Sequence, residues 1–369
     1  MNTSYNTCIR AFICTVCALC AVFSALCGTT GSGDDVGVRR DRLLQYLNSL
    51  SGRHGKKILS GQQCEAWPRI AKTRLGDLER IYAKTGKWPA IGGFEYCEMK
   101  GSTTEPALFK PPRWREVNPF IKEWNEKGGL VTISAHLPNP WTGSSAWDTS
   151  ERKRLSELCL PDSASRRAYW RMVEGLADGL EDLQRIGIVV LWRPFHELEG
   201  SWFWWGGEGR EGSRATVLKR LWREMHKYMT EKRRLDNLIW VFNGKLCHYP
   251  GDDVVDLNSA DIYGNNVGES ISKLVPALAS NDKKPFALAE FGPSWKKGQI
   301  ERYDFSDFAN EVLAAAPNCA YFLCWTGPWS LWHNDNTDKL MSDPRIVTLD
   351  DLKFELGLAA RQGNLTEWR

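Results

Sequence analysis

Eight short apolar segments recur along the chain, and each ends in polar residues. They are residues 56–62, 89–96, 129–136, 188–197, 237–244, 254–264, 285–292 and 320–327. Amphipathic helical patterns lie between several of them, most clearly at 165–185, 216–233 and 305–316. Apolar, β-branched runs of this length indicate strands buried on both faces, as in parallel sheets covered by helices. Eight such strand–helix units predict a single (β/α)8 barrel.

The alternative fold is a doubly wound open sheet. Such sheets often carry a glycine-rich turn for nucleotide binding, and no G-x-G-x-x-G or G-x-x-x-x-G-K-S/T sequence opens a helical segment here. The sequence also shows no internal repeat, no low-complexity stretch and no linker to a second domain. We therefore expect one barrel domain at 28–369, with its chemistry at the C-terminal ends of the strands.

The charged residues nearly balance. There are 48 Lys and Arg against 45 Asp and Glu, which is a formal net charge of +3. A protein that binds nucleic acid or an anionic membrane through its charge usually carries a larger basic excess. The balance argues against both kinds of partner, and we expect a monomer.

Residues 11–27 form an uncharged apolar run, AFICTVCALCAVFSALC, directly behind Arg10. The run is too short and too close to the N-terminus for a membrane span, and small residues follow it, as in a secretory signal peptide. We therefore predict a signal peptide at 1–27, a secreted protein and no membrane-spanning segment. A lipid anchor on Cys27 is the alternative, to which the preceding Leu26 is a poor fit.

Six of the 11 cysteines follow this leader: Cys64, Cys97, Cys159, Cys247, Cys319 and Cys324. An even number in an oxidising compartment permits disulfides, although sequence alone does not give their pairing. The one pairing that we expect is Cys64 with Cys97, because both follow adjacent strand ends by a similar distance. No C-x-x-C pair remains and the histidines are scattered, so a zinc site is not expected.

The fourth apolar segment continues into an unusual sequence, IVVLWRPFHELEGSWFWWG (188–206). A buried strand ends in polar residues that include Glu197, and four aromatic residues follow at 202–205. The C–H faces of a sugar ring pack on flat aromatic surfaces while its hydroxyls bond to polar groups. We therefore predict a glycoside hydrolase in which residues 202–205 form a ligand surface, whereas Trp192 and Trp240 belong to the core.

In a barrel, the residues at the strand ends share one face. That face would collect Gln62, Gln63, Glu95, His136, Arg193, His196, Glu197, Asn243, Tyr263, Glu290 and Trp325. Glu197 and Glu290 end otherwise apolar strands and are three strand–helix units apart, so they would face each other across the barrel mouth. Glycoside hydrolysis needs such a pair of carboxylates, and a separation of about 5–5.5 Å predicts retention of configuration.

The surroundings of the two glutamates predict different roles. Aromatic neighbours would help Glu197 to hold its proton, as a general acid must. Arg193 and Tyr263 would keep Glu290 ionised, as a nucleophile must be. His196 could orient either a carboxylate or a sugar hydroxyl.

Some strand-end residues also have a purely structural interpretation. A lone Glu after an apolar strand is often a helix cap or a surface residue, which leaves the role of Glu95 open. His136 is either a satisfied core histidine or a ligand contact, and we favour the ligand contact. Tyr263 could simply fill the end of the barrel.

The block WRPFHELEGSWFWWG (192–206) and the shorter AEFG (289–292) resemble glycoside hydrolase family 26, whose best-known members are secreted endo-β-1,4-mannanases. Weaker similarities are LSGQQ (59–63), GGFEY (92–96), ISAH (133–136), YPGDDVVDL (249–257) and the CW at 324–325. The resemblance implies a retaining (β/α)8 hydrolase that cleaves internal bonds of mannan, glucomannan or galactomannan. Glu197 would be the acid/base and Glu290 the nucleophile.

The resemblance implies further roles at the same face. Trp202 and Trp325 would stack on sugar rings, and His136, Arg193 and Tyr263 would line the subsite around the cleaved bond. It implies no metal and no organic cofactor.

Two residues depart from the family pattern. Glu199 stands where an uncharged Asn is more common, and Glu95 replaces what is often Asp. An extra carboxylate at position 199 could alter the pKa of Glu197 or a subsite contact.

Three interpretations of the activity remain open from sequence. The first is an endo-acting β-mannanase. The second keeps the mechanism but changes the substrate to β-1,3-xylan or mixed-linkage β-glucan, or releases mannobiose from chain ends. The third is a catalytically silent carbohydrate-binding protein on the same fold, against which the presence of both glutamates argues.

Overall fold

The barrel strands coincide with the eight apolar segments. The computed structural model describes residues 35–50, 56–64, 75–97, 112–207, 214–274, 284–296 and 298–355. The barrel consists of β2 (Gly61–Gln63), β3 (Ile91–Glu95), β4 (Leu130–Ser134), β5 (Val190–Arg193), β6 (Leu238–Asn243), β7 (Leu257–Tyr263), β8 (Phe286–Gly292) and β11 (Cys319–Cys324). These strands are parallel and pair in chain order, and β11 closes the ring by pairing with both β8 and β2. The predicted (β/α)8 barrel is confirmed.

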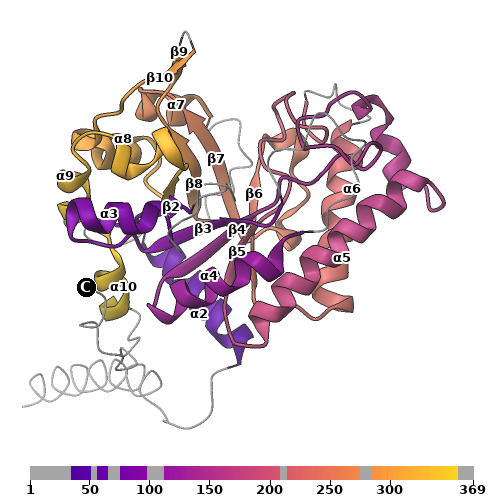
Figure 1. Ribbon diagram of the computed structural model, residues 1–369, viewed down its shortest axis with the longest axis horizontal. Coiled ribbons are helices and arrows are strands. Elements are labelled where there is room, and N and C mark those ends of the chain that lie inside the picture. The colour runs from indigo at the N-terminus through magenta and orange to yellow at the C-terminus, as the bar shows by residue number, and fades with distance from the viewer. Residues whose placement is uncertain are drawn as a thin grey trace, which may run out of the picture. The chain divides into compact units, whose positions relative to one another are not determined.

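Four short strands extend this ring or lie outside it. Residues Ile58–Leu59 form β1, which precedes β2 and also pairs with β11. Residues Ile346–Val347 form β12, which pairs with β1. Residues Trp295–Lys296 (β9) and Gln299–Ile300 (β10) form an antiparallel hairpin shortly after β8. This hairpin extends beyond the barrel strands at the top of Figure 1.

Helices surround the strands in Figure 1, with α5 and α6 on one side and α3, α8 and α9 on the other. The helices are α2 (Val36–Ser49), α3 (Asp77–Thr85), α4 (Trp114–Glu126), α5 (Ala164–Gln184), α6 (Arg214–Lys227), α7 (Val267–Leu274), α8 (Phe308–Ala315), α9 (Thr337–Ser342) and α10 (Leu349–Glu355). The three helical patterns at 165–185, 216–233 and 305–316 are confirmed. The second of them ends in a π-helical turn at Tyr228–Lys232 and the third begins with a 3-10 turn at Phe305–Asp307.

Local sequence explains where these helices begin and what they bury. The Ser163 hydroxyl accepts a hydrogen bond from the backbone N–H of Arg166 and caps α5. This helix buries a stripe that includes Met172, Leu176 and Leu180. Each such side chain contributes about 1.5–3 kcal/mol when it leaves water. The stripe therefore fixes the face that α5 turns toward the barrel.

The strands are buried over nearly their whole length, as their composition predicts. Every residue of β5 and β6 is buried. Trp192 and Trp240 are 0% and 2% exposed, so their assignment to the core is confirmed. Since all barrel strands are parallel, their polar C-terminal residues meet at one end, which is where the candidate site lies.

The expected disulfide between Cys64 and Cys97 is wrong, because both are free, buried thiols. Gln63 pairs with Gly93, so Cys64 is level with Phe94 and Cys97 lies three residues further along the chain. Three extended residues span about 10 Å. A disulfide tolerates a Cα separation of only about 7 Å. The other four cysteines beyond the leader, all within the described ranges, are free as well.

The predicted signal peptide at 1–27 lies outside the described residues. Within the residues that the structure does describe, no helix combines the length and apolar character needed to cross a membrane.

Candidate active site

The C-terminal ends of the barrel strands and the loops after them border an open pocket of about 300 Å³. It is lined by His136, Trp147, His196, Glu197, Trp202, Phe203, Tyr263, Glu290, Trp295, Trp325 and Trp329. Seven of the eight site residues expected from sequence are in this lining. The eighth, Arg193, is 1% exposed and bonds to Glu290, so it supports the pocket without lining it. The structure thus brings all eight expected residues together.

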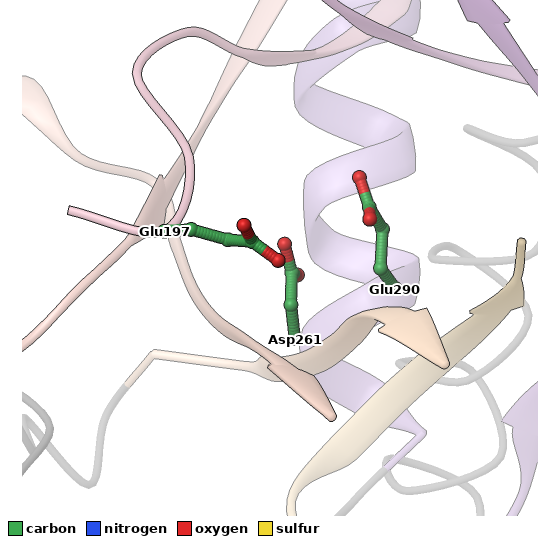
Figure 2. A group of neighbouring side chains, drawn as sticks. All are labelled: Glu197, Asp261 and Glu290. Carbon is green, nitrogen blue, oxygen red and sulfur yellow. The ribbon is translucent and has the colours of Figure 1, made fainter. Parts of the chain in front are cut away.

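Three carboxylates lie close together here, and two of them, Glu197 and Glu290, line the pocket. One oxygen from each of Glu197, Asp261 and Glu290 lies within 4.8 Å of the other two. Figure 2 shows the three side chains converging from the segment after β5, from β7 and from β8. The spacing of Glu197 and Glu290 suits a retaining glycosidase, because inverting enzymes separate their carboxyl groups by about 6.5–9.5 Å.

Arg193 and Tyr263 hold the Glu290 carboxylate from two sides. The Arg193 guanidinium donates to Oε1, and the Tyr263 hydroxyl donates to Oε2 at 2.7 Å. Burial of the Tyr263 hydroxyl, followed by the charges of Glu290 and Glu197, raises the Tyr263 pKa well above its ordinary value. Tyr263 therefore keeps its proton and remains a donor. These contacts are the ones that the sequence predicted around Glu290.

Sequence reasoning missed Asp261. Its Oδ2 accepts from Arg193 at 2.7 Å and its Oδ1 accepts from the Asn243 side chain at 2.7 Å. The pairing of β7 with β8 shifts register after Ala260, so that Asp261 is level with Glu290. Such bulges re-aim side chains next to active sites. A signal existed: Asp261 is a charge inside an apolar strand, two residues from Tyr263 and hence on the same face.

Burial and mutual repulsion raise the pKa values of two of these three carboxyl groups, Asp261 and Glu197. Burial and the charge of Glu290 raise the pKa of Asp261 to about 8, against the opposing effect of Arg193. Burial, followed by the charges of Asp261 and Glu290, raises the pKa of Glu197 well above its ordinary value. Burial alone would lower the pKa of Arg193. The charges of Asp261 and Glu290 outweigh this effect and raise that pKa, so Arg193 stays cationic. The surroundings of Glu197 therefore favour its protonated form, as a general acid requires.

Glu197 occupies a backbone conformation that is rare for residues with side chains. Its φ is 52°, and that of Phe195 is 49°. Such conformations cost about 1–3 kcal/mol and persist only where other contacts enforce them. Here the Glu197 backbone N–H donates to Asn243 Oδ1 at 2.7 Å, and the Trp202 indole N–H donates to Glu197 Oε2. These two contacts aim the carboxyl group into the pocket.

The sequence left the role of Glu95 open, and its contacts show that it is buried beside His136. Its Oε1 accepts from the backbone N–H groups of Cys97 and His136, both at 2.8 Å. Its Oε2 accepts from the Ser134 hydroxyl at 3.0 Å and bonds to His136 Nδ1 at 2.7 Å. Neither a helix cap nor a surface position describes it. Glu95 instead fixes the ring orientation of His136 behind the pocket wall.

The chain of contacts continues to His196, whose Nε2 lies 3.1 Å from Nε2 of His136. Burial, followed by the charges of Arg193 and His136, lowers the pKa of His196 well below its ordinary value, so it is neutral. Its Nδ1 is buried without a hydrogen-bond partner among the described residues. An unpaired acceptor costs less than an unpaired N–H. We therefore assign the His196 proton to Nε2, which donates to His136.

We expect Glu95→Gln to lower the free energy of unfolding by about 1–3 kcal/mol, because an amide N–H₂ would face donors that now bond to a carboxylate. Urea unfolding followed by Trp fluorescence measures the change. The matched control is Glu174→Gln, an exposed Glu on α5. It should stay within about 0.5 kcal/mol of the wild type. Equal stability of the two variants would contradict the role given to Glu95.

The aromatic run after Glu197 divides between surface and core. Trp202 is 48% exposed, whereas Phe203, Trp204 and Trp205 are buried. The expectation that 202–205 form a ligand surface is therefore wrong for Trp204 and Trp205, and Phe203 contributes only a buried wall of the pocket. The indole N–H groups of Trp204 and Trp205 donate to the carbonyls of Leu137 and His196, both at 2.8 Å. They hold the loop that presents Trp202.

Three tryptophans of the pocket were missed by sequence reasoning. Trp147 stacks on His136 with ring centroids 5.0 Å apart. Trp295 and Trp329 lie nearly parallel, with centroids 6.3 Å apart. They were missed because each lies several residues beyond the end of a barrel strand, in β9, in a 3-10 turn or in a loop. Their positions carried a signal, since Trp295 follows Glu290 by five residues and Trp329 follows Trp325 by four.

The three carboxylates are also the group within the described residues that could hold a metal ion. Divalent cations favour such oxygen ligands. However, Arg193 already donates to Asp261 and Glu290. The raised pKa of Glu197 also works against a third anionic ligand. The arrangement favours proton transfer and covalent chemistry over metal binding.

The comparisons with known proteins agree with this geometry. The chain matches the sequence model of Glycosyl hydrolase family 26 over residues 37–351. It is 32% identical over 313 residues to a mannan endo-1,4-beta-mannosidase of Bacillus subtilis strain 168, covering 82% of this chain and 83% of that protein. It is 30% identical over 326 residues to the mannan endo-1,4-beta-mannosidase A and B of Caldalkalibacillus mannanilyticus, covering 84% of this chain but only 60% of that protein.

Solved structures show the same likeness. The YdhT protein from Bacillus subtilis superposes with a TM-score of 0.73 at 28% identity, covering 84% of this chain and 92% of that one. The Bacillus subtilis mannanase man26 superposes with a TM-score of 0.70 at 27% identity, covering 83% and 91%. On the matched family model and these relatives, the chain belongs to glycosyl hydrolase family 26 and is a glycoside hydrolase.

Proposed function

We propose that the protein is a retaining endo-β-1,4-mannanase that hydrolyses internal bonds of mannan, glucomannan or galactomannan. The observation that carries the proposal is the pair of glutamates, Glu197 and Glu290, with oxygens within 4.8 Å and with different surroundings. The substrate class is supported by the relatives named mannan endo-1,4-beta-mannosidases, two of which are 32% identical to this chain.

In the first step, Glu197 is the acid and Glu290 the nucleophile. The Glu197 carboxyl group gives its proton to the glycosidic oxygen while Glu290 attacks the anomeric carbon. The bond from that carbon to the leaving oxygen breaks as the ester bond to Glu290 forms. Arg193 and Tyr263 hold the Glu290 carboxylate in place until it attacks.

In the second step, the ionised Glu197 takes a proton from water. The resulting hydroxide attacks the same carbon and displaces the Glu290 carboxylate, which restores both groups. Two inversions at one carbon give net retention. Asp261 takes no covalent part: it bonds to Arg193, and its ionisation as the pH rises raises the pKa of Glu197.

Exposed aromatic surfaces on both sides of the glutamates favour cleavage inside a chain. Trp202 is 48% exposed beside Glu197, and Trp295 is 61% exposed beyond Glu290. A sugar chain could therefore extend past the cleaved bond in both directions. We propose that the substrate is bound without any metal or organic cofactor.

The test is product analysis on β-1,4-mannan, in parallel with β-1,3-xylan and mixed-linkage β-glucan. We expect manno-oligosaccharides of several lengths, with the β-anomer formed first by NMR. Mannobiose alone would indicate chain-end action. Products only from xylan or glucan would change the substrate and keep the mechanism. Binding of mannan without any product would instead indicate a silent carbohydrate-binding protein.

The raised pKa of Glu197 predicts the alkaline limit of activity. Since Glu197 must be protonated to act as the acid, kcat/KM should fall as pH rises through its pKa. That fall should lie well above the ordinary value of 4.5 for a glutamate. The measurement is kcat/KM on manno-oligosaccharide from pH 4 to pH 10.

Glu199 is expected to contribute to this limit. Its Oε2 is buried and, within the described ranges, accepts no hydrogen bond, and its charge raises the pKa of Asp261. Glu199→Gln should therefore lower the pKa of Asp261, so that Asp261 ionises earlier and the alkaline limit set by Glu197 moves to higher pH. Glu231→Gln, on the exposed turn after α6, is the control and should leave it unchanged. An unchanged limit in Glu199→Gln would show that this charge does not reach Glu197.

We also propose that the protein is secreted after removal of 1–27 and acts as a monomer. The support is the sequence of the leader, an apolar run behind Arg10 followed by small residues. N-terminal sequencing of the protein recovered from the medium tests the cleavage, and a lipid-modified Cys27 would indicate an anchored form. Light scattering of the processed protein tests the monomer.

A further inference from the structure

The side of the pocket that holds Glu290 carries an aromatic surface of its own. Trp329 meets the ring of Tyr263 edge-on, with centroids 6.0 Å apart. Trp295 continues this row, nearly parallel to Trp329 at 25° and 6.3 Å. At that distance, rings in contact must be offset rather than directly superposed. The row of Trp329 and Trp295 therefore begins at the ring of Tyr263, whose hydroxyl bonds to Glu290.

The backbone makes room for this row. Gly292 ends β8, two residues after Glu290, and the Trp329 ring packs against it. A Cβ on Gly292 would lie 2.4 Å from Cδ1 of Trp329, so a larger residue would displace the ring. Trp295 comes from the β9–β10 hairpin, which extends beyond the barrel in Figure 1. Two separate loops thus place their indoles side by side.

The exposure of Trp295 shows that it is not a core residue. At 61% it has the largest exposed fraction among the large hydrophobic residues of the described chain. It also lines the pocket. A tryptophan that is buried so little contributes little to folding. An exposed indole beside a carbohydrate pocket is instead suited to pack against the C–H face of a sugar.

The roles of the two glutamates indicate which side of the cleaved bond this row contacts. Glu197 protonates the oxygen of the leaving group, so Trp202, which donates to Glu197, borders the leaving sugar. Glu290 attacks the anomeric carbon of the ring on the other side of the bond. Trp329 and Trp295 continue from Tyr263, whose hydroxyl bonds to Glu290.

Resting on the proposed function, we propose that Trp329 and Trp295 form a platform for the sugars on the non-reducing side of the cleaved bond. The platform lies beyond the ring that Glu290 attacks. It determines how many sugars remain on the non-reducing fragment, and hence the lengths of the products.

The test is the position of cleavage in a hexasaccharide whose reducing end carries ¹⁸O. The oligosaccharide is the manno-, gluco- or xylo-hexaose that the wild type cleaves fastest. Trp295→Ala should place fewer sugars on the non-reducing side, so that the labelled fragments become longer. Trp202→Ala should shift cleavage the opposite way. Ile186→Ala is the control, because it is 51% exposed and precedes β5 at the opposite end of the barrel.

Kinetics give a second readout. Trp295→Ala should raise KM for the hexasaccharide about tenfold, with kcat within about twofold, because stacking binds the substrate and the transition state alike. KM for an aryl disaccharide, too short to reach Trp295, should not change. Trp295→Tyr should restore most of the wild-type pattern, which a purely structural role would not require.

The outcomes separate the platform from the activity. An unchanged cleavage pattern in Trp295→Ala, or a shift in the direction of Trp202→Ala, would overturn the platform even if mannan is the substrate. A wild type that prefers gluco- or xylo-hexaose would overturn the mannan assignment, and the platform would then be judged on that substrate. Thermal unfolding of each variant confirms that it is folded, which the exposure of Trp295 leads us to expect.

Discussion

Glu290→Ala should reduce kcat on the order of 10⁵-fold on polysaccharide and on activated aryl glycosides alike. Without the carboxylate no covalent intermediate forms, and a good leaving group does not replace the missing nucleophile. The variant should still fold, because Arg193 keeps its ion pair with Asp261. The measurement is initial-rate kinetics on mannan and on a dinitrophenyl β-glycoside.

Azide distinguishes this variant from a merely disturbed site. A small anion can enter the space left by the side chain and attack from the same face, which gives an α-glycosyl azide from a β-glycoside. Glu269→Ala, an exposed Glu on α7, is the matched control and should keep full activity. A β-glycosyl azide from Glu290→Ala, or substantial residual turnover, would remove Glu290 from the role of nucleophile.

Glu197→Ala should affect the two substrates unequally. On polysaccharide, kcat/KM should fall about 10²–10⁴-fold, because the leaving oxygen no longer receives a proton. On a dinitrophenyl glycoside, kcat/KM should fall far less, since that leaving group needs no protonation. The second step lacks its base in both cases, so the glycosyl-enzyme should accumulate and appear as a burst of dinitrophenol.

Azide again provides the decisive product. It attacks the accumulated intermediate without needing a base, and the second inversion gives a β-glycosyl azide. The opposite anomers from Glu197→Ala and Glu290→Ala would assign the two roles independently of any rate. Equal loss of kcat/KM on both substrates, with no burst, would contradict the acid/base role of Glu197.

Much of the fold could be predicted because its signals are local. Each barrel strand is a run of apolar residues that stands out from its neighbours, as in LIWVF at 238–242. The helix after Ser163 is equally clear from its apolar period and its cap. Glu197 and Glu290 stood out for the same reason, since Glu197 follows an apolar strand and Glu290 lies near the end of another. Parallel strands then bring such ends together without any further information.

The contacts that tune the site could not be predicted in this way. Asp261 reaches Glu290 only because the register of β7 against β8 shifts at Ala260. Glu95 reaches His136 because β3 and β4 are adjacent, with Glu95 level with Ser134. Both depend on which residues of two distant segments become level. Register is a property of the closed barrel rather than of either strand.

Burial was the second property that local sequence did not decide. Trp202, Trp204 and Trp205 are the same residue type within four positions, yet one faces the pocket and two lie in the core. The indole N–H groups of the two core residues, Trp204 and Trp205, donate to the carbonyls of Leu137 and His196. These partners are distant in sequence or set by the fold of the loop. The sequence by itself determined the barrel, the family and the two glutamates, because hydrophobic burial of parallel strands is written in local patterns. Only the tertiary structure decided the protonation of those glutamates and the shape of the aromatic surface, because electrostatics and packing depend on distances between segments far apart in the chain.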